Sequence, residues 1–238
     1  MVSAIILASG KGARMNISTP KQYLDLGGRP LLSHTLTAMG ACSLIDEILI
    51  VIPEKDFDFC KKKIIPQSRL SIAPSLVAGG VKRQESVYNG IRAVNNKSRI
   101  ILIHDGVRPF IRPKQIEACI DGAKEFGACI QGIPAYDTLK KSDDLFWITD
   151  TLTGKGVWLA QTPQAFSAPI IKKAHENALC KGFTGTDDAS LVELLGVKVK
   201  ILNGSRFNIK ITDQEDLKLA KAIMGYRALG SLKNNFTF

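Results

Sequence analysis

A turn rich in small and basic residues follows the first apolar run of the chain, and its residue types suit the binding of a phosphate chain. The turn and its flank contain Ala8, Ser9, Gly10, Lys11, Gly12, Arg14 and Lys21. Small residues let backbone N–H groups approach and donate to phosphate oxygens, while the basic side chains supply positive charge. A nucleoside triphosphate would suit such a loop.

Two familiar phosphate-binding signatures do not describe this turn. No Gly-Lys-Ser/Thr closes it, which excludes a Walker loop, and Met15 takes the third glycine position of the dinucleotide fingerprint. An ordinary glycine-rich turn between a strand and a helix is the alternative, and two glycines taken alone favour it. The other motifs of the chain decide between these interpretations.

Further motifs follow in a fixed order along the chain. They are Pro20 to Gln22 (PKQ), Gly79 to Val87 (GGVKRQESV), Ile103 to Phe110 (IHDGVRPF), Ala160 to Gln164 (AQTPQ), Thr186 to Ser190 (TDDAS) and Asn208 to Thr212 (NIKIT). With the first turn, ASGKGARM, this set resembles the 2-C-methyl-D-erythritol 4-phosphate cytidylyltransferase family in content and order. The resemblance spans roughly residues 2 to 224, and the motifs are specific as a set although each is weak alone.

The resemblance implies a reaction in which the acceptor phosphate attacks the α-phosphorus of CTP while pyrophosphate departs. The product would be 4-diphosphocytidyl-2-C-methyl-D-erythritol, an isoprenoid precursor, and Mg²⁺ would assist. Such a transfer needs no covalent intermediate, so positioning and electrostatics should supply most of the acceleration. The close alternative is another polyol-phosphate cytidylyltransferase, such as the ribitol 5-phosphate enzyme, which shares the loop and the Asn-Ile-Lys motif; the TDDAS and GGxxRQxSV motifs favour the first assignment.

The resemblance also implies roles for individual residues. Arg14 and Lys21 match transition-state stabilisers, and Lys210 matches the lysine that orients the acceptor phosphate. Nucleotide contacts are implied for Ala8, Ser9, Gly10, Lys11, Gly12, Gly79, Gly80, Ser86 and Gly106. A solvated lysine on a strand is the alternative for Lys210, although its place between two isoleucines favours an inward side chain.

Contacts to the acceptor are implied for a second group of residues. They are Asp105, Arg108, Thr138, Thr162 and Thr186. Asp105 closes a buried strand at its carboxyl end, where open α/β sheets bind ligands, so it is the candidate for holding Mg²⁺ as well. A turn or helix-capping aspartate, and threonines bonded within their own helices, are the alternatives.

Two positions depart from the family pattern: Val81 stands where an acidic residue is expected, and the larger departure lies on the arm. Family members usually carry an arginine four positions before the aromatic residue that is Trp158 here, on an arm that reaches the partner subunit's acceptor site. This chain has Gly154 there, with Lys155 beside it. Lysine supplies a point charge but not the same two-pronged contact.

Short apolar runs alternate with amphipathic segments, which predicts the elements that must position these residues. The pattern is that of an α/β protein with a mostly parallel, three-layer, Rossmann-like sheet. Predicted strands are 2–7, 48–52, 100–103, 128–133, 197–202 and 208–211, and predicted helices are 31–41, 57–64, 84–94, 113–126, 169–179, 188–195 and 213–224. The polar segment Ala135 to Lys155 breaks the rhythm and predicts a projecting β-arm.

Composition bounds the remaining possibilities. The 238 residues, 45% of them hydrophobic, predict one domain over residues 1–230 and a frayed tail over 231–238. The net charge of +10 is scattered, and with only 7% aromatic residues it favours small polyanionic substrates over nucleic acid; a non-catalytic nucleotide- or nucleic-acid-binding protein is the remote alternative.

The cysteines and the arm predict the setting of the protein. Five widely spaced cysteines predict small core residues in a reducing cytoplasm, and no stretch is long enough to span a membrane. The arm, which has little core to pack on, predicts a homodimer.

Overall fold

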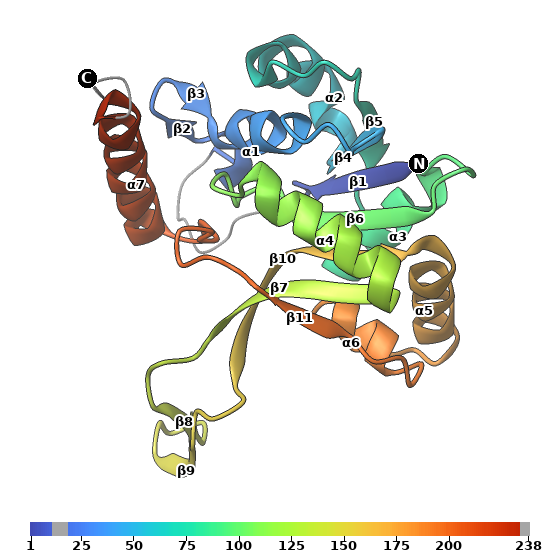
Figure 1. Cartoon of the computed structure of the whole chain (residues 1–238), viewed down its shortest axis with the longest axis vertical. Coiled ribbons are helices and arrows are strands. Elements are labelled where there is room, and N and C mark those ends of the chain that lie inside the picture. The colour runs from blue at the N-terminus through green and yellow to red at the C-terminus, as the bar shows by residue number, and fades with distance from the viewer. Residues whose placement is uncertain (11–18, 234–238) are drawn as a thin grey trace.

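A twisted seven-stranded sheet lies between two layers of helices (Figure 1). The computed structural model describes residues 1–10 and 19–233. In spatial order the strands are β11 (Lys200–Asn203), β7 (Ala128–Pro134), β10 (Trp158–Ser167), β6 (Ile100–Asp105), β1 (Val2–Leu7), β4 (Glu47–Ile52) and β5 (Ser75–Ala78). Only β10 runs antiparallel to its neighbours, so the mostly parallel α/β prediction is confirmed.

Strand β1 shows why the apolar runs form the middle layer. Ala4 and Ile6 belong to one buried cluster, and Ile5 and Leu7 belong to a second cluster on the opposite face. Because successive side chains of a strand point to opposite faces, a strand covered on both sides needs apolar residues at every position. A continuous apolar run is therefore the mark of a central strand here.

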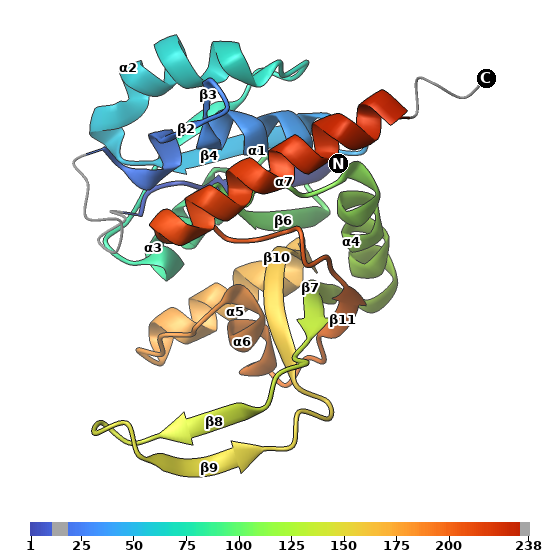
Figure 2. The same ribbon diagram turned by 90° about the vertical axis from the view of Figure 1, so that its left-hand side faces the viewer.

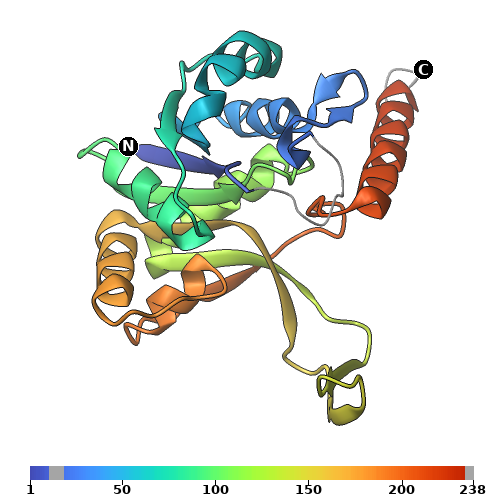
Figure 3. The ribbon, with the colours of Figure 1, turned by 180° about the vertical axis from the view of Figure 1, so that it is seen from behind.

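Helices cover both faces, as the amphipathic segments predict, and Figures 1 and 3 show the molecule from these two sides. The first cluster takes side chains from α1 (Leu31–Gly40) and α4 (Pro113–Phe126); the second takes them from α3 (Arg83–Ala93), α5 (Ala168–Cys180) and α6 (Asp188–Glu193). The predicted helix at 57–64 is helical throughout but irregular, because it consists of short segments of different helix types within a longer series. These are η3 (Glu54–Asp56), α2 (Phe57–Phe59), η4 (Cys60–Ile64) and η5 (Ile65–Ser68).

Strands β5 and β10 were not predicted. In β10 the pairing register shifts between Gln161 and Gln164, around the cis bond from Thr162 to Pro163. Proline cannot donate to a sheet ladder, so it is accommodated where the ladder is already interrupted. The AQTPQ motif, for which no element was predicted, therefore lies in the middle of the longest strand.

A smaller third cluster joins the C-terminal helix to the segment after the first loop. Helix α7 (Gln214–Lys233) packs there against the short strand β2 (Asp25–Leu26), which follows the helical turn η2 (Lys21–Tyr23) and pairs with β3 (Arg29–Pro30). The side chain of Asp213 caps α7 by accepting from the backbone of Asp216 at 2.9 Å, as the acidic helix start predicts.

The predicted strand at 208–211 is wrong. These residues form no ladder, and the backbone N–H of Ile211 donates to the Val107 carbonyl at 3.0 Å instead. The segment crosses the carboxyl end of β6, where no strand edge is open to it, and its apolar side chains pack into the third cluster.

The predicted arm is confirmed as a projecting hairpin of β8 (Leu139–Ser142) and β9 (Ile148–Leu152), which leaves the sheet between β7 and β10 (Figure 2). Its tip exposes four apolar side chains, Leu145, Phe146, Trp147 and Ile148, by 63% to 89%. At its root the Arg206 guanidinium lies 4.3 Å from the centre of the Tyr136 ring.

Two expectations from composition can be compared with the structure. Cys42, Cys60, Cys119 and Cys129 are buried, as predicted, but Cys180 is exposed because it ends α5 on the solvent side. Within residues 1–10 and 19–233, none of the helices combines the length and apolarity that crossing a bilayer requires.

Candidate active site

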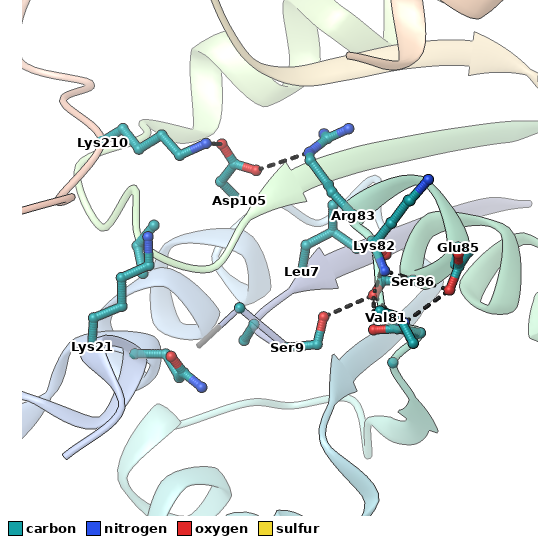
Figure 4. Close-up of a pocket in the computed structure, with 16 residues that line it drawn as sticks. Leu7, Ser9, Lys21, Val81, Lys82, Arg83, Glu85, Ser86, Asp105 and Lys210 are labelled. Carbon is teal, nitrogen blue, oxygen red and sulfur yellow. Dashed lines mark hydrogen bonds and ion pairs between the residues drawn. The ribbon is translucent and has the colours of Figure 1, made fainter. Parts of the chain in front are cut away.

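A cavity of about 530 Å³ opens at the carboxyl ends of β1 and β6, and it gathers most of the motifs (Figure 4). Its lining consists of Leu7, Ala8, Ser9, Gly10, Lys21, Gln22, Gly79, Gly80, Val81, Lys82, Arg83, Glu85, Ser86, Asp105, Val107 and Lys210. Lys21 and Lys210 approach it from one side, and Ser9 and Ser86 from the other. A polar crevice at this edge of an open α/β sheet is the usual place for a ligand.

Asp105 is the centre of charge in the cavity. Its Oδ2 atom lies 3.0 Å from Lys210 Nζ and 3.6 Å from Arg108 Nε, and its Oδ1 atom lies 3.7 Å from Arg83 Nε. Burial alone would raise the pKa of this carboxyl, but Lys210, Arg83 and Arg108 hold the pKa well below its ordinary value. Three cations around one carboxylate leave excess positive charge facing the cavity, which suits anionic substrates.

Lys210 reaches this carboxylate although its segment is irregular. The N–H at Arg108 Nη1 donates to the carbonyl of Asn208 at 2.6 Å, and the Asn208 side chain donates to the Thr162 carbonyl at 2.8 Å. Both side chains are buried. These bonds fix the backbone two residues before Lys210, so the inward orientation expected for its side chain arises without a strand.

Two neighbouring loops meet over the other wall of the cavity. The hydroxyls of Ser9 and Ser86 lie 2.9 Å apart, and the Gly80 N–H donates to the Ser86 hydroxyl at 3.0 Å. A Cβ atom at Gly79 would collide with the Ser9 side chain, so only glycine permits this approach. Glu85 steadies the loop by accepting from the Val81 N–H at 2.9 Å.

Thr162 lies beneath the cavity and supports it. Burial lowers the pKa of His104 to about 4, so its ring is neutral near neutral pH. Its Nε2 atom lies 3.2 Å from the Arg108 carbonyl, which can only accept, so Nδ1 must accept from the Thr162 hydroxyl 3.0 Å away. The same hydroxyl accepts from the Asp105 N–H at 3.0 Å. Thr162 thus has its one proton committed to His104.

The remaining predicted residues fall into three groups. Gly106 packs against β1 beside the cavity, and the buried Arg108 braces its floor. Thr138 at the root of the arm and Thr186 before α6 are exposed and are not part of the lining. Lys11, Gly12 and Arg14 lie outside the described residues.

Gly154 has a backbone conformation that its residue type explains. It lies in the turn between β9 and β10 with φ of +65°, which L side chains rarely adopt. Lys155 beside it is exposed. The departure from the family pattern therefore coincides with a left-handed turn.

Sequence reasoning missed several residues that hold the site in place. Asp187 and Asp188 lie in the TDDAS motif, but the role there was given to Thr186; similarly, Gln164 in the AQTPQ motif received no role. Asp188 lies 2.8 Å from Arg83, and Gln164 binds the start of α6. Two adjacent aspartates in a segment that is otherwise small and polar were the available indication.

Comparisons with known proteins agree with this geometry. The family model of 2-C-methyl-D-erythritol 4-phosphate cytidylyltransferase matches residues 2–226. A protein of that name from Syntrophus aciditrophicus is 47% identical over 223 residues, covering 94% of this chain and 95% of the relative, and one from Syntrophotalea carbinolica is 45% identical over 224 residues, covering 94% and 96%.

Solved structures agree as well. The crystal structure of 4-diphosphocytidyl-2C-methyl-D-erythritol synthase from Anaerococcus prevotii is similar with a TM-score of 0.82 at 35% identity, covering 94% of this chain and 96% of that one. Both the sequence match and the structural match extend over nearly the whole chain. The chain therefore belongs to the 2-C-methyl-D-erythritol 4-phosphate cytidylyltransferase family.

Proposed function

We propose that this protein transfers CMP from CTP to 2-C-methyl-D-erythritol 4-phosphate and releases pyrophosphate, a step of isoprenoid precursor synthesis. Family membership supports the reaction. The single observation in the structure that carries it is the pair of Lys210 and Asp105, 3.0 Å apart at the mouth of a cationic cavity between two glycine-rich loops.

The chemistry joins two anions, so charge neutralisation is its main requirement. An oxygen of the acceptor phosphate forms a bond to the α-phosphorus of CTP, and the bond from that phosphorus to the pyrophosphate oxygen breaks. Lys21 and Lys210 enter the cavity from the same side, where they would bind the triphosphate and the acceptor phosphate. Arg14 joins them in the proposal on sequence grounds. Such preorganised cations act mainly on the transition state.

The two loops would hold the nucleotide. The backbone around Gly79 and Gly80 is exposed to the cavity because neither residue has a side chain, and Ser9 and Ser86 connect this loop to the first one. Backbone N–H and carbonyl groups at such a place are suited to reading the edge of a base. We propose that they bind the cytosine and the ribose.

Mg²⁺ is part of the proposal, with Asp105 as its protein ligand. Mg²⁺ commonly binds through one or two carboxylates together with substrate phosphates, so one ionised carboxylate facing the cavity fits. In the described part of the chain, no group of three or more His, Cys, Asp or Glu side chains is placed to hold a metal by itself. The triphosphate would therefore complete the coordination, and the ion would neutralise charge on it.

The arm supports a homodimer as a further part of the proposal. A two-stranded hairpin is marginally stable alone, and the tip leaves Phe146 and Trp147 in solvent. Burial against a second copy would remove this apolar surface from water. Light scattering at micromolar concentration tests this, and a monomer would contradict it. A cytoplasmic location also stays a proposal, supported by five free cysteines.

The test of function is release of pyrophosphate from CTP with purified protein. We expect turnover with 2-C-methyl-D-erythritol 4-phosphate and little with ribitol 5-phosphate. Turnover with ribitol 5-phosphate alone would identify that compound as the acceptor. Tight, salt-sensitive RNA binding without CTP turnover would indicate a nucleic-acid-binding protein instead of an enzyme. Lys61→Ala, at an exposed lysine outside the cavity lining, is the matched control for variants of Lys21 and Lys210.

A further inference from the structure

A line of buried charged side chains runs from the cavity into the body of the protein. Arg83 Nε lies 3.7 Å from Asp105 Oδ1, and its Nη2 atom lies 2.8 Å from Asp188 Oδ2. The other oxygen of Asp188 lies 3.2 Å from His175 Nε2. Asp188 and His175 are only 1% and 2% exposed, so neither can contact a substrate in the cavity.

Arg83 and Asp188 are both charged near neutral pH. Burial alone would raise the pKa of Asp188, but Arg83 and the hydrogen bond from His175 hold it below its ordinary value. Burial likewise opposes the charge on Arg83, but Asp188 and Asp105 raise its pKa. Arg83 is therefore a cation held between two carboxylates.

The position of Asp188 is fixed from outside the line. The side chain of Gln164 on β10 accepts from the backbone N–H of Asp188 at 3.1 Å and of Ala189 at 3.2 Å. It also donates to Asp187 Oδ2 at 2.7 Å, while Asp187 caps α6 by accepting from the Ser190 N–H at 3.0 Å. Asp188 is thus anchored to the sheet and cannot follow Arg83 if Arg83 moves.

The two contacts of Arg83 are unequal, and this inequality matters for the cavity. The short contact is made to Asp188 and the long one to Asp105. We propose that Asp188, held by His175 and the start of α6, is a positioning residue that keeps Arg83 from closing on Asp105. One oxygen of Asp105 then stays open to the cavity, where Mg²⁺ and the hydroxyl groups of the acceptor would bind, while the other contacts Lys210. The inference rests on the proposed function and assigns a role to two residues remote from the substrate.

The first test is Asp188→Asn, which keeps the shape of the side chain and removes its charge. Arg83 should then turn to Asp105, so the KM for the acceptor should rise about tenfold, the range of one lost hydrogen bond to a charged group. The KM for CTP, measured at saturating Mg²⁺ so that the metal site on Asp105 stays filled, should change less than about threefold. Equal changes in both constants, or no change, would overturn the proposal.

Glu193→Gln is the matched control. It removes one negative charge from the same helix at an exposed side chain. We expect its acceptor KM to stay within about twofold of wild type. An acceptor KM raised as much as in Asp188→Asn would assign the effect to α6 as a whole and overturn the specific role of Asp188.

A double-mutant cycle with Arg83→Met tests whether Asp188 acts through Arg83. Coupled residues give non-additive effects. Adding Asp188→Asn to Arg83→Met should therefore raise the acceptor KM by less than about twofold. Effects that multiply would mean that Asp188 acts by another route.

Two further measurements keep the proposal testable under other outcomes. If Asp188→Asn does not fold, His175→Leu loosens Asp188 instead, and a folded variant with both KM values unchanged would overturn the role. If wild-type protein turns over no CTP with the acceptor, the proposed function fails by itself. The crystal structure of Asp188→Asn then decides: Arg83 Nε at roughly 3 Å from Asp105 supports positioning, and an unchanged distance refutes it.

Discussion

Ion pairs form both at the cavity edge of the sheet and on the arm, but they differ in burial and in the parts of the chain that they join. Around the buried Asp105, the ion pairs join side chains from several distant parts of the chain. On the arm the pair of Lys141 and Asp150, 3.8 Å apart, stands in solvent and belongs to one hairpin. The charged groups at the cavity are therefore restrained by several neighbours, whereas those on the arm are exposed to solvent.

The difference shows where each region obtains its stability. The cavity edge stands on two apolar clusters that bury β1 and β6 on both faces. The arm has its apolar residues at the tip, pointing away from any core of its own chain. The cavity edge is supported by the core of its own chain, whereas the apolar side chains at the tip of the arm are exposed.

The largest difference should appear in stability when one carboxylate of each region is neutralised. Asp105→Asn removes the counter-charge of the buried Arg108 and weakens the pairing of Lys210, so we expect the free energy of unfolding to fall by about 3 kcal/mol. Asp150→Asn breaks an exposed pair and should cost less than about 1 kcal/mol. Urea unfolding of both variants measures these free energies. Equal losses of stability would contradict the difference between the two regions.

Lysines of the two regions should differ in catalysis. Lys21→Ala, and on sequence grounds Arg14→Ala, should lower kcat about a hundredfold or more, as when one preorganised electrostatic donor is removed. Lys140→Ala on the arm, whose amine donates to Thr151 at 2.7 Å, is the comparison and should keep kcat within about threefold. Steady-state kinetics at saturating CTP measures this difference. Full turnover by a folded Lys21→Ala variant would contradict the proposed mechanism.

Acid should destabilise the cavity side through His104. Its folded pKa of about 4 lies below its ordinary value of 6.5, so between these pH values the unfolded chain binds a proton that the folded chain does not. Stability is therefore lost as pH falls from 6.5 to 4, by up to about 3 kcal/mol. The arm contains no histidine. Comparing unfolding of wild type and His104→Gln across this range tests the prediction; parallel curves would contradict it.

The smallest effect on folding is expected at the tip of the arm. Trp147→Ser removes an exposed side chain and should change the unfolding free energy of the isolated chain by no more than about 0.5 kcal/mol. It should nevertheless weaken the proposed dimer, because apolar area leaves the contact. Light scattering over a dilution series measures this, and an unchanged dimer would place the contact elsewhere.

Local patterns were sufficient for much of the framework. Strand 2–7 and helix 113–126 were predicted with the bounds that the structure has, because β1 is apolar at every position except Ser3 and α4 begins with proline and ends at a left-handed Gly127. The arm was predicted because its polar alternation interrupts the rhythm. By contrast, β10 was missed because its proline is tolerated only through pairing with strands far away in the sequence.

The sequence by itself determined the layer arrangement, the family motifs and the cavity residues that adjoin strand ends. These properties depend on periodicity and residue type, which are local. Only the tertiary structure decided that Lys210 contacts Asp105 from an irregular segment. It also decided that the Thr162 hydroxyl is hydrogen-bonded to His104 and that Asp188 forms an ion pair with Arg83. Each of these contacts joins residues between 58 and 105 positions apart, and no local pattern encodes such a distance.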